Sequence, residues 1–317
     1  MRTFVQLRRL MDSNRDLARK IERMEKKYDE QFALSLKQLA DKYYTSAAAT
    51  LTTLKVDLQK EEEKIAVSFT IPANVPASNN APASNTAPGG GYSRQKVNAG
   101  IGEYLVDIIA ADLGSTRVIV DTASDSDCRD NCPVLSLGDY VGRNGAYAGV
   151  NGSYFCPASY PQCAGKANSF DTLLMKKNKK YFNSYNNVYS TVPAVIFQGG
   201  SIRFVGQSLE WGRDTGIDSM IANQPIVLSG GNIAFGGDGD PKKGSRGSRS
   251  FVANKGNTVY IGVVHNATVA EVGHVLKALG LENGLNLDSG GSTALWYNGY
   301  KAGPGRNIPN AILFVRK

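Results

Sequence analysis

The first 71 residues show a helical pattern of apolar positions and contain neither glycine nor proline. Apolar side chains recur every three or four residues, as on one face of a long helix. The phase shifts by one residue partway along, which resembles a stutter in a coiled coil, and the seam comprises Leu17, Ile21, Met24, Tyr28, Phe32, Leu36, Leu39 and Tyr43. We predict a long coiled-coil-like helix over residues 1–71, or two helices joined near Thr45–Thr50, that self-associates or packs on a neighbour.

This pattern disappears in residues 72–94, which consist largely of Pro, Ala, Ser, Asn and Gly with almost no charge. Such a composition is typical of a flexible, partly extended linker. We therefore predict a linker over residues 72–94 that precedes a globular domain over residues 95–317.

In the globular part, short apolar runs alternate with glycine-rich turns, which favours strands. The expected strands are Tyr104–Ala110, Thr116–Asp121, Ala194–Gln198, Ile202–Val205, Gln224–Leu228, Thr258–Val264 and Ala311–Val315. Helices are expected over Leu135–Arg143 and over Val269–Leu279, where Thr268 and Glu271 form a capping box. The expected fold is α+β: a mixed, largely antiparallel sheet domain with a few helices, preceded by the long helix and the linker.

One stretch, Leu285–Tyr297, reads as a strand that ends at a carboxylate and is followed by a glycine turn. Leucines alternate with polar residues up to Asp288, where the strand should end. The turn supplies bare amides and hydroxyl groups, from Ser289, Gly290, Gly291, Ser292 and Thr293. Such a set fits a pocket for a sugar or a phosphate, and the alternative is a plain hairpin in which Asp288 caps its own turn.

The order strand, helix, strand in residues 258–287 should place Asp288 at the carboxyl end of a strand, where crevices form in α/β sheets. Glu271 is a candidate second catalytic carboxylate. Its place in the capping box favours a structural role instead.

The formal net charge of +8, from 36 basic and 28 acidic residues, is spread along the chain. This indicates a mildly basic soluble protein, and we expect no nucleic acid as a partner. Basic residues cluster at 176–180 and 242–249, which we interpret as solvated loops that would also accept an anionic glycan. No run reaches membrane-spanning length and no signal peptide is visible, so no transmembrane segment is expected.

All four cysteines lie in one loop-like stretch, at Cys128, Cys132, Cys156 and Cys163. Their spacing, without a nearby histidine, differs from the C-x2-C pairs usual for zinc. Two small disulfide loops fit better, and three pairings are open. Disulfides indicate an oxidising compartment, so we expect an extracellular or cell-envelope location, for which the N-terminus shows no export signal.

Three further polar residues are candidates for binding or catalysis. Asn151, followed by Gly152, interrupts an apolar strand and offers an amide to a substrate oxygen, although a plain turn would look the same. Arg249 begins one strand and Arg306 precedes the last. Arginine suits planar recognition of phosphate or carboxylate, but a lone arginine in a loop is usually solvated.

Together these stretches resemble the phosphodiester glycosidase family, a domain shared by bacterial exopolysaccharide-related proteins and the lysosomal enzyme that removes N-acetylglucosamine from a phosphodiester. The resemblance covers about residues 95–317, and it is carried by Val150–Phe155, Arg249–Ala253, Thr268–Leu281, Leu287–Ser292 and Arg306–Val315. Ser289 replaces the commoner glycine, and Ser250 stands where threonine is frequent. Neither departure removes a charged group, so both bear on the substrate more than on the fold.

The resemblance implies hydrolysis of the glycosidic C–O bond in an N-acetylglucosamine-type sugar-1-phosphodiester, on cell-surface or exopolysaccharide material. Asp288 would face the anomeric carbon as nucleophile, base or electrostatic partner, Arg249 would hold the phosphate, and Asn151 would orient the sugar or the leaving oxygen. The implied substrate-binding residues are Gly152, Ser289, Gly290, Gly291, Ser292 and Arg306.

No cofactor is expected, although the acidic stretches Asp121–Asp130 and Gly236–Asp240 offer ligands for a divalent cation such as calcium without an EF-hand spacing. The expected partner is a carbohydrate or sugar-phosphate substrate. The alternative to an enzyme is a non-catalytic glycan-binding or surface-assembly module displayed on the coiled coil, which would bind without releasing product.

Overall fold

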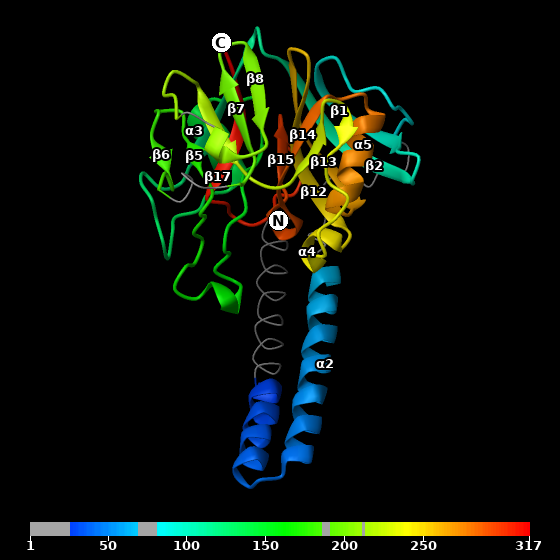
Figure 1. The fold of residues 1–317 in the computed structure, drawn as a ribbon, viewed down its shortest axis with the longest axis vertical. Helices are drawn as coiled ribbons and strands as arrows, with labels where there is room; N and C mark the ends of the chain where they lie inside the picture. The colour runs from blue at the N-terminus through cyan, green and yellow to red at the C-terminus, as the bar shows by residue number, and fades with distance from the viewer. Residues whose placement is uncertain (1–25, 69–80, 186–190, 211–212) are drawn as a thin grey trace, which may run out of the picture. The chain divides into compact units, whose positions relative to one another are not determined.

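The structure is a computed structural model that describes residues 26–68, 81–185, 191–210 and 213–317. The chain divides into two compact units, residues 1–71 and 72–317. The described part of the first unit is helical, and that of the second is built mainly from strands (Figure 1).

In the described part of the helical unit, residues 26–68, the chain forms a hairpin of two helices. Residues 26–40 are helical, the chain turns at 41–43, and α2 (Tyr44–Ser68) runs back along the first helix (Figure 1). Thr50 Oγ1 donates to Gln38 Oε1 across the hairpin at 2.9 Å. The two helices therefore pack on each other within one chain.

A single long helix over residues 1–71 is wrong for the described part of this unit, because the chain reverses at Lys42, which has a left-handed φ of 64°. Two helices form, as the alternative allowed, but the break precedes Thr45–Thr50. The hairpin buries Ser35, Ala47 and Leu54 and leaves the predicted seam residues Phe32, Leu36, Leu39 and Tyr43 exposed. The seam before residue 26 lies outside the described residues.

Residues 81–90, within the predicted linker, run against the first strand, β1 (Gly91–Asn98). The Ser84 amide donates to the carbonyl of Lys96 at 2.9 Å. Gln95 Nε2 donates to the Ser84 carbonyl at 2.8 Å. This segment is therefore held by the strand-rich unit, and residues 72–80 lie outside the described part.

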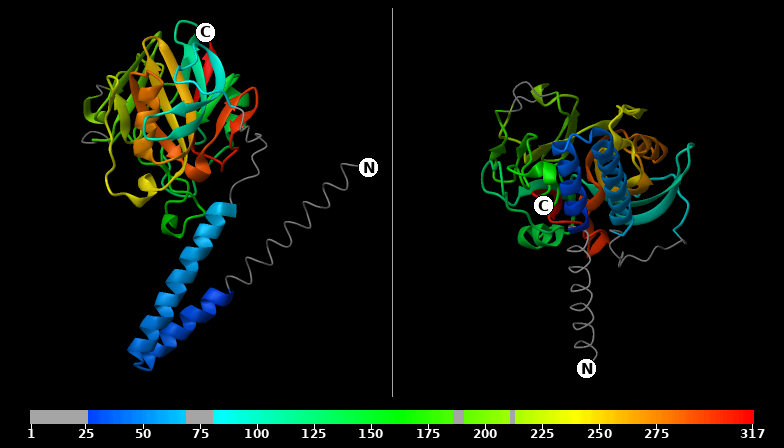
Figure 2. Two further views of the ribbon diagram at one scale, coloured as in Figure 1. Left: turned by 90° about the vertical axis from the view of Figure 1, so that its right-hand side faces the viewer. Right: turned by 90° about the horizontal axis from the view of Figure 1, so that it is seen from below.

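Three sheets form the strand-rich unit (Figures 1 and 2). Sheet 1 has the order β1, β2 (Glu103–Asp112), β13 (Thr258–Ala267), β12 (Gly247–Lys255), β14 (Asn283–Ser289), β10 (Ile226–Ser229), β11 (Asn232–Ile233). Sheet 2 has the order β16 (Tyr300–Ala302), β15 (Leu295–Tyr297), β4 (Ala148–Asn151), β17 (Asn310–Arg316), β3 (Thr116–Thr122). Sheet 3 has the order β6 (Tyr181–Phe182), β5 (Leu174–Met175), β9 (Ser219–Ala222), β7 (Ala194–Gln198), β8 (Ser201–Val205).

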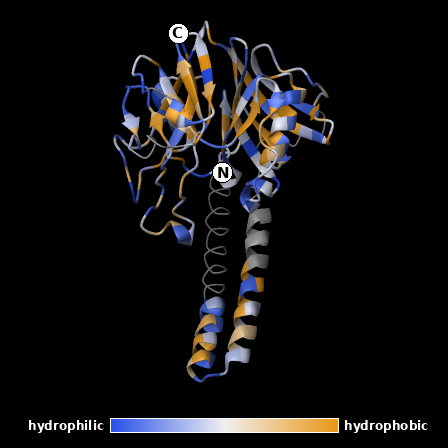
Figure 3. Cartoon of the chain, viewed as in Figure 1, coloured by the Kyte–Doolittle hydropathy of each residue, from blue (hydrophilic) through white to orange (hydrophobic). Residues whose placement is uncertain are grey.

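Neighbouring strands pair antiparallel in all three sheets, which confirms the predicted α+β class. Each expected strand is present, with ends shifted by a few residues. The sheets share an apolar core, to which they contribute residues such as Leu287, Ile312 and Ile221 respectively. Figure 3 shows the apolar residues concentrated on these strands.

Two helices cover outer sheet faces. α5 (Val269–Ala278) packs on sheet 1, and its capping box is confirmed because Thr268 Oγ1 accepts from the Glu271 amide at 3.2 Å. The Glu271 carboxylate accepts from the Thr268 amide at 2.7 Å, which confirms its structural role. α3 (Leu137–Asn144) packs on sheet 2. None of the helices in the described segments is long and apolar enough to cross a bilayer.

β13, α5 and β14 follow one another along the chain, but β12 lies between the two strands. Each strand pairs antiparallel with β12. The crevice typical of parallel α/β sheets is therefore not the setting of Asp288. The residue does lie at the carboxyl end of β14, next to last in the strand.

Candidate active site

Asp288 lies at a bulge where β14 leaves its regular pairing with β12. Arg249 pairs with Ser289 and Phe251 with Asn286, so β14 has one extra residue between these two pairs. A bulge redirects the neighbouring side chain and is common beside active sites. The extra residue therefore takes the Asp288 side chain out of the regular alternation of the strand.

The main chain of Asp288 is held from sheet 2. Its N–H donates to the Gly152 carbonyl at 2.9 Å, and its carbonyl accepts from Asn151 Nδ2 at 2.6 Å. Asn151 is fully buried, and its Oδ1 accepts from Ser250 Oγ at 2.7 Å. The sequence predicts that Asn151 donates to substrate, but its amide is bonded inside the protein at both atoms. Its observed role is to position Asp288.

Gly152 has a packing reason of its own, although the sequence predicts a substrate contact there. A Cβ at this position would overlap Asn310 Oδ1 and lie 2.9 Å from the Asn310 carbonyl oxygen. Asn310 is fully buried and accepts from the Ser153 amide at 2.8 Å. Glycine is therefore required for the approach of β4 to β17.

The half-buried carboxyl group of Asp288 has a raised pKa. Burial shifts the pKa from its ordinary value of 3.8 to about 6, because it disfavours the charged form. The Ser292 hydroxyl, the Ser289 amide and the guanidinium groups of Arg306 and Arg249 act in the opposite direction. A carboxyl group with this pKa exchanges protons near neutral pH, as general acid–base catalysis requires.

The Arg249 guanidinium group is held by backbone carbonyls. Nε donates to Ala267 at 3.0 Å, and Nη2 donates to Lys242 at 2.9 Å and to Ser245. Burial lowers the pKa of Arg249, while nearby acidic groups that include Asp288 raise it. Arg249 is therefore a fixed positive charge beside Asp288, with much of its donor capacity already used.

Arg306 reaches the glycine turn from the loop before β17. Its amide donates to the Gly291 carbonyl at 2.8 Å, and a Cβ on Gly291 would lie 3.1 Å from Arg306 Cζ. Nη1 of Arg306 is buried and has no hydrogen-bond partner in the described part of the chain. An unpaired buried donor is costly unless a ligand satisfies it. Arg306 therefore keeps a donor that no described protein atom satisfies, whereas the donors of Arg249 are largely used.

Tyr160 lines the same region and stands out only in the structure. Its ring centre lies 4.9 Å from the Arg306 guanidinium carbon and 5.7 Å from Lys242 Nζ, which are cation–π distances. The residue lies within the loop closed by the disulfide between Cys156 and Cys163. An aromatic residue inside a short cysteine loop was the available sequence signal.

Tyr154 is a second residue that sequence reasoning missed. Its hydroxyl accepts from Asn286 Nδ2 at 2.6 Å, and its amide donates to Asn223 Oδ1 at 2.9 Å. Burial and then the charge of Asp288 raise the pKa of Tyr154, so the hydroxyl keeps its proton and remains a donor at neutral pH. The available sequence signal concerned Asn286, the partner of the Tyr154 hydroxyl, because Asn286 and Asp288 alternate with leucines on one strand.

The remaining predicted substrate-binding residues are brought together at the end of β14. Ser289 is half-buried, and Gly290 and Gly291 are exposed within the 3₁₀ turn Gly290–Ser292. The Ser289 amide donates to Asp288 Oδ1 at 2.9 Å, so Asp288 also caps its own turn. Asp288 therefore combines turn capping with a carboxyl group of raised pKa.

The structure pairs Cys128 with Cys132 and Cys156 with Cys163. This confirms two small disulfide loops, selects one of the three open pairings and excludes the zinc alternative. Two disulfides are consistent with an extracellular location.

Carboxylates of both acidic stretches have protein partners, which are cations for some and backbone amides for others, as for Asp127 and Asp130. Asp121 pairs with Arg143 at 2.7 Å, and Asp238 pairs with Lys243. Within the described segments, no three His, Cys, Asp or Glu side chains are grouped to hold a metal ion.

The sequence profile of the phosphodiester glycosidase family matches residues 144–315 of this chain. The matched range contains Asn151, Arg249, Asp288 and Arg306. No curated protein sequence matches the chain.

A solved structure of low sequence identity shares the fold. The catalytic domain of zebrafish N-acetylglucosamine-1-phosphodiester alpha-N-acetylglucosaminidase, auto-inhibited by its pro-peptide, aligns with a TM-score of 0.56 and 14% identity, over 75% of this chain and 87% of that chain. A hypothetical protein from Synechocystis aligns with a TM-score of 0.48 and 14% identity over 71% of this chain. The alignment spans 62% of the Synechocystis chain, which is less than two thirds of its length.

Proposed function

The chain belongs to the phosphodiester glycosidase family, and from this membership we propose that it hydrolyses the glycosidic C–O bond of a sugar-1-phosphodiester. The observation that carries the proposal is a carboxyl group of near-neutral pKa, Asp288, beside the charges of Arg306 and Arg249. A carboxylate for the reacting carbon and cations for the phosphate are the two groups that this reaction needs. N-acetylglucosamine, which the name of the zebrafish enzyme contains, is the first sugar to test.

In the proposed reaction, ionised Asp288 takes a proton from a water molecule as the water oxygen bonds to the anomeric carbon. The bond between that carbon and the phosphate oxygen breaks, and its electron pair leaves with the phosphomonoester. Arg306 Nη1, the unpaired buried donor, receives the phosphate, and Arg249 adds a fixed charge. The Tyr154 hydroxyl, oriented by Asn286, donates to the sugar or the leaving oxygen. Because a phosphomonoester leaves readily, the scheme needs no second carboxylate and no cofactor.

We place the substrate on cell-surface or exopolysaccharide material. The two disulfides support this location, because disulfides persist in oxidising compartments. The family also matches the bond type, while the identity of the sugar and of its aglycone is the finer part of the proposal.

Self-association through the helical unit is the second part of the proposal. The described helices expose apolar side chains, including Phe32, Leu34, Leu36 and Leu39, each at least 41% accessible. Large apolar side chains gathered and exposed on one helix are typical of a surface that contacts another chain. Sedimentation of the full chain should show a mass above one protomer, and a monomer at micromolar concentration would contradict this part alone.

The test of the activity is a product assay with the full-length protein on a synthetic N-acetylglucosamine phosphodiester, with and without a chelator. Released sugar and phosphomonoester are both measured. We expect Asp288→Asn and Arg306→Ala each to lower kcat/KM by about 100-fold or more. Lys255→Ala, at the far end of β12 from Arg249, is the control that loses a charge without loss of turnover.

Three outcomes would change the assignment. Unchanged turnover in both Asp288→Asn and Arg306→Ala would remove the catalytic scheme. Stoichiometric binding of the phosphodiester without product would favour the glycan-binding module. Activity abolished by the chelator and restored by calcium would add a cation to the reaction.

A further inference from the structure

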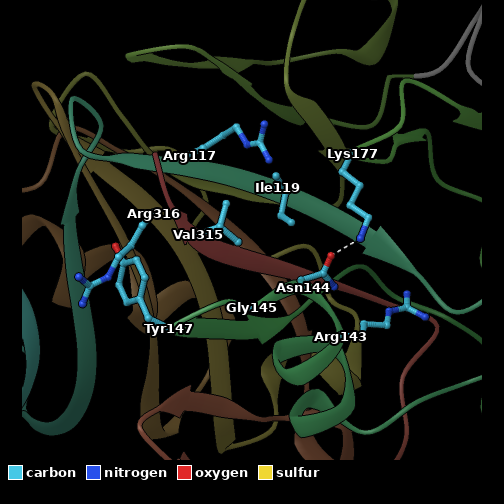
Figure 4. A pocket seen from close by; sticks show the side chains of 9 residues that line it. All are labelled: Arg117, Ile119, Arg143, Asn144, Gly145, Tyr147, Lys177, Val315 and Arg316. Atoms are coloured by element: carbon cyan, nitrogen blue, oxygen red, sulfur yellow. Dashed lines mark hydrogen bonds between the residues drawn. The ribbon is translucent and has the colours of Figure 1, made fainter.

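The hollow in Figure 4 is lined by basic residues, but their charges do not converge on one ligand. Arg143 and Lys177 share the buried carboxylate of Asp121, at 2.7 and 3.6 Å. The strand register places Arg117 and Arg316 on opposite faces of sheet 2. This hollow therefore presents no two free cations to a single anion.

The basic stretch 242–249, in contrast, reaches the candidate active site, and one of its charges has no counter-charge. Three of its four basic residues have partners within the protein: Lys243 pairs with Asp238, Arg246 pairs with Glu271, and Arg249 donates to backbone carbonyls. Lys242 is exposed and makes no ion pair with any residue that the structure describes. Its ammonium group is therefore the charge of this stretch that is open to an anion.

The main chain of Lys242 is fixed beside the active site. Its amide donates to Asp240 Oδ1 at 2.8 Å, which caps α4 (Pro241–Gly244), and its carbonyl accepts from Arg249 Nη2 at 2.9 Å. Asp240 Oδ2 lies 3.8 Å from Lys243 Nζ. The capping carboxylate is thus directed to the neighbouring lysine, and the side chain of Lys242 starts from a fixed point next to Arg249.

One aromatic ring connects Lys242 with Arg306. The centre of the Tyr160 ring lies 5.7 Å from Lys242 Nζ and 4.9 Å from Arg306 Cζ. The separation of the two cationic groups therefore cannot exceed the sum of these distances. Tyr160 is 38% accessible, and Arg306 keeps the buried Nη1 donor that no described atom satisfies. An exposed ring thus has two cations against it, each able to bind an oxyanion.

We propose that Lys242 binds a second oxyanion on the substrate, so that the preferred aglycone is itself anionic. This inference rests on the proposed function, in which Arg306 receives the phosphate next to the sugar. A phosphodiester carries a single negative charge, so a neutral aglycone leaves Lys242 unused. An aglycone with a phosphate or carboxylate group a short spacer away reaches both cations across the Tyr160 ring. The substrate class is therefore a phosphate-linked or acidic glycan.

Binding tests this site without turnover. Calorimetric titration of the full-length protein compares propane-1,3-diol bisphosphate, 4-(phosphonooxy)butanoate and propyl phosphate. We expect the two probes with a second anion to bind the wild type about fivefold tighter or more than propyl phosphate does, as one exposed ion pair allows. Lys242→Gln should lose this advantage and keep its affinity for propyl phosphate. Lys243→Gln loses the same charge one residue further on, where Asp238 already compensates for it, and should bind as the wild type does.

Turnover supplies the second readout. The two substrates are N-acetylglucosamine phosphodiesters with a propyl and with a 3-phosphopropyl aglycone. Lys242→Gln should raise KM for the anionic aglycone about fivefold or more and leave kcat unchanged. For the propyl aglycone, neither constant should change.

Two results would overturn the proposal. In the first, the wild type binds the probes with a second anion no more tightly than propyl phosphate. In the second, Lys242→Gln and Lys243→Gln lose affinity equally, which would show only the diffuse charge of the loop. Failure to hydrolyse either phosphodiester, with a preference for the second anion that still depends on Lys242, would remove the hydrolase and leave the anion site.

Discussion

At the residue scale, the raised pKa of Asp288 means that this carboxyl group destabilises the folded protein at neutral pH. The folded-state pKa of about 6 lies above the ordinary value of 3.8, so the folded state binds the proton more tightly. Stability therefore falls as pH rises from about 4 to about 6 and stays low above that window. A shift of this size corresponds to about 1–3 kcal/mol.

We expect Asp288→Asn to raise the unfolding temperature at pH 7.5, because the neutral amide avoids the cost of a buried charge. The gain should vanish at pH 4, where the wild-type carboxyl group is largely protonated. Thermal unfolding at the two pH values measures this. Asp171→Asn, at an exposed position, is the control and should change neither value. A loss of stability in Asp288→Asn at pH 7.5 would show that the carboxylate is a net stabilising group.

The ionisation of Asp288, which lowers stability, should raise the activity. Since the proposed base must be ionised, kcat/KM should rise with pH through about 6, the value given for Asp288. A pH profile on a small phosphodiester measures it. A profile that falls through this range would assign Asp288 as the acid rather than the base.

Gly152 links stability to the site. We expect Gly152→Ala to lower the free energy of unfolding by about 1–3 kcal/mol, because the new methyl group overlaps Asn310. Activity should fall too, because the Gly152 carbonyl holds the Asp288 amide. Gly142→Ala is the matched control, since its Cβ would meet open space in α3 and alanine favours a helix. Equal denaturant midpoints for both variants would show that β4 adapts freely.

The sequence identifies Asn151 and Gly152 as candidate site residues, but it does not reveal their roles. A short polar motif after an apolar run looks the same whether its amide faces a substrate or the protein interior. The difference arises from β14 and β17, which are distant in sequence and close in space. Asp288 is different, because a carboxylate between a leucine strand and two glycines is unusual in the sequence itself.

At the element scale, the Cys156–Cys163 loop carries Tyr160 to Arg306. We expect Cys156→Ser/Cys163→Ser to raise KM several-fold, because the ring loses its fixed place beside Arg306, the arginine that we propose binds the phosphate. The change should also cost about 2 kcal/mol of unfolding free energy.

The other disulfide provides the control for this change. Cys128→Ser/Cys132→Ser removes a loop of similar size and should cost a similar unfolding free energy. It should leave KM unchanged. Equal KM values in the two double variants would show that the Tyr160 loop has no part in substrate binding.

Elements with strong local signals are found from the sequence. The α5 capping box and the alternating strands are local features, so they are visible without a fold. The turn at residues 41–43 carries no glycine or proline, and its left-handed residue is a lysine, so the break leaves no trace in the pattern. Strands such as β5 and β6 contain two residues each, too few to show a period.

At the scale of the whole molecule, the strand-rich unit should fold without the helical one. A fragment of residues 81–317 keeps the segment that pairs with β1, whereas residues 91–317 lack it. We expect the longer fragment to unfold in one cooperative transition with its disulfides formed. The shorter fragment should unfold at a lower temperature, because Gln95 and Lys96 lose their partners at Ser84.

Calorimetry of the two fragments measures the difference, and the full-length chain is the control. Equal unfolding temperatures for both fragments would show that residues 81–90 contribute nothing to the stability of the sheet. Loss of phosphodiester turnover in residues 81–317 alone would show that the helical unit takes part in the reaction.

The peptide groups around Asp288 have a mechanical consequence. They bridge β14 to β4, so any sliding of one layer over the other shifts the carboxyl oxygen atoms of Asp288 directly. Interior side chains such as Leu287 and Val150 set the distance between β14 and β4, and changes in them should therefore alter the position of the Asp288 carboxyl group. Laboratory evolution toward a new aglycone should accordingly select substitutions in the hydrophobic core of the domain, at residues that do not contact the ligand.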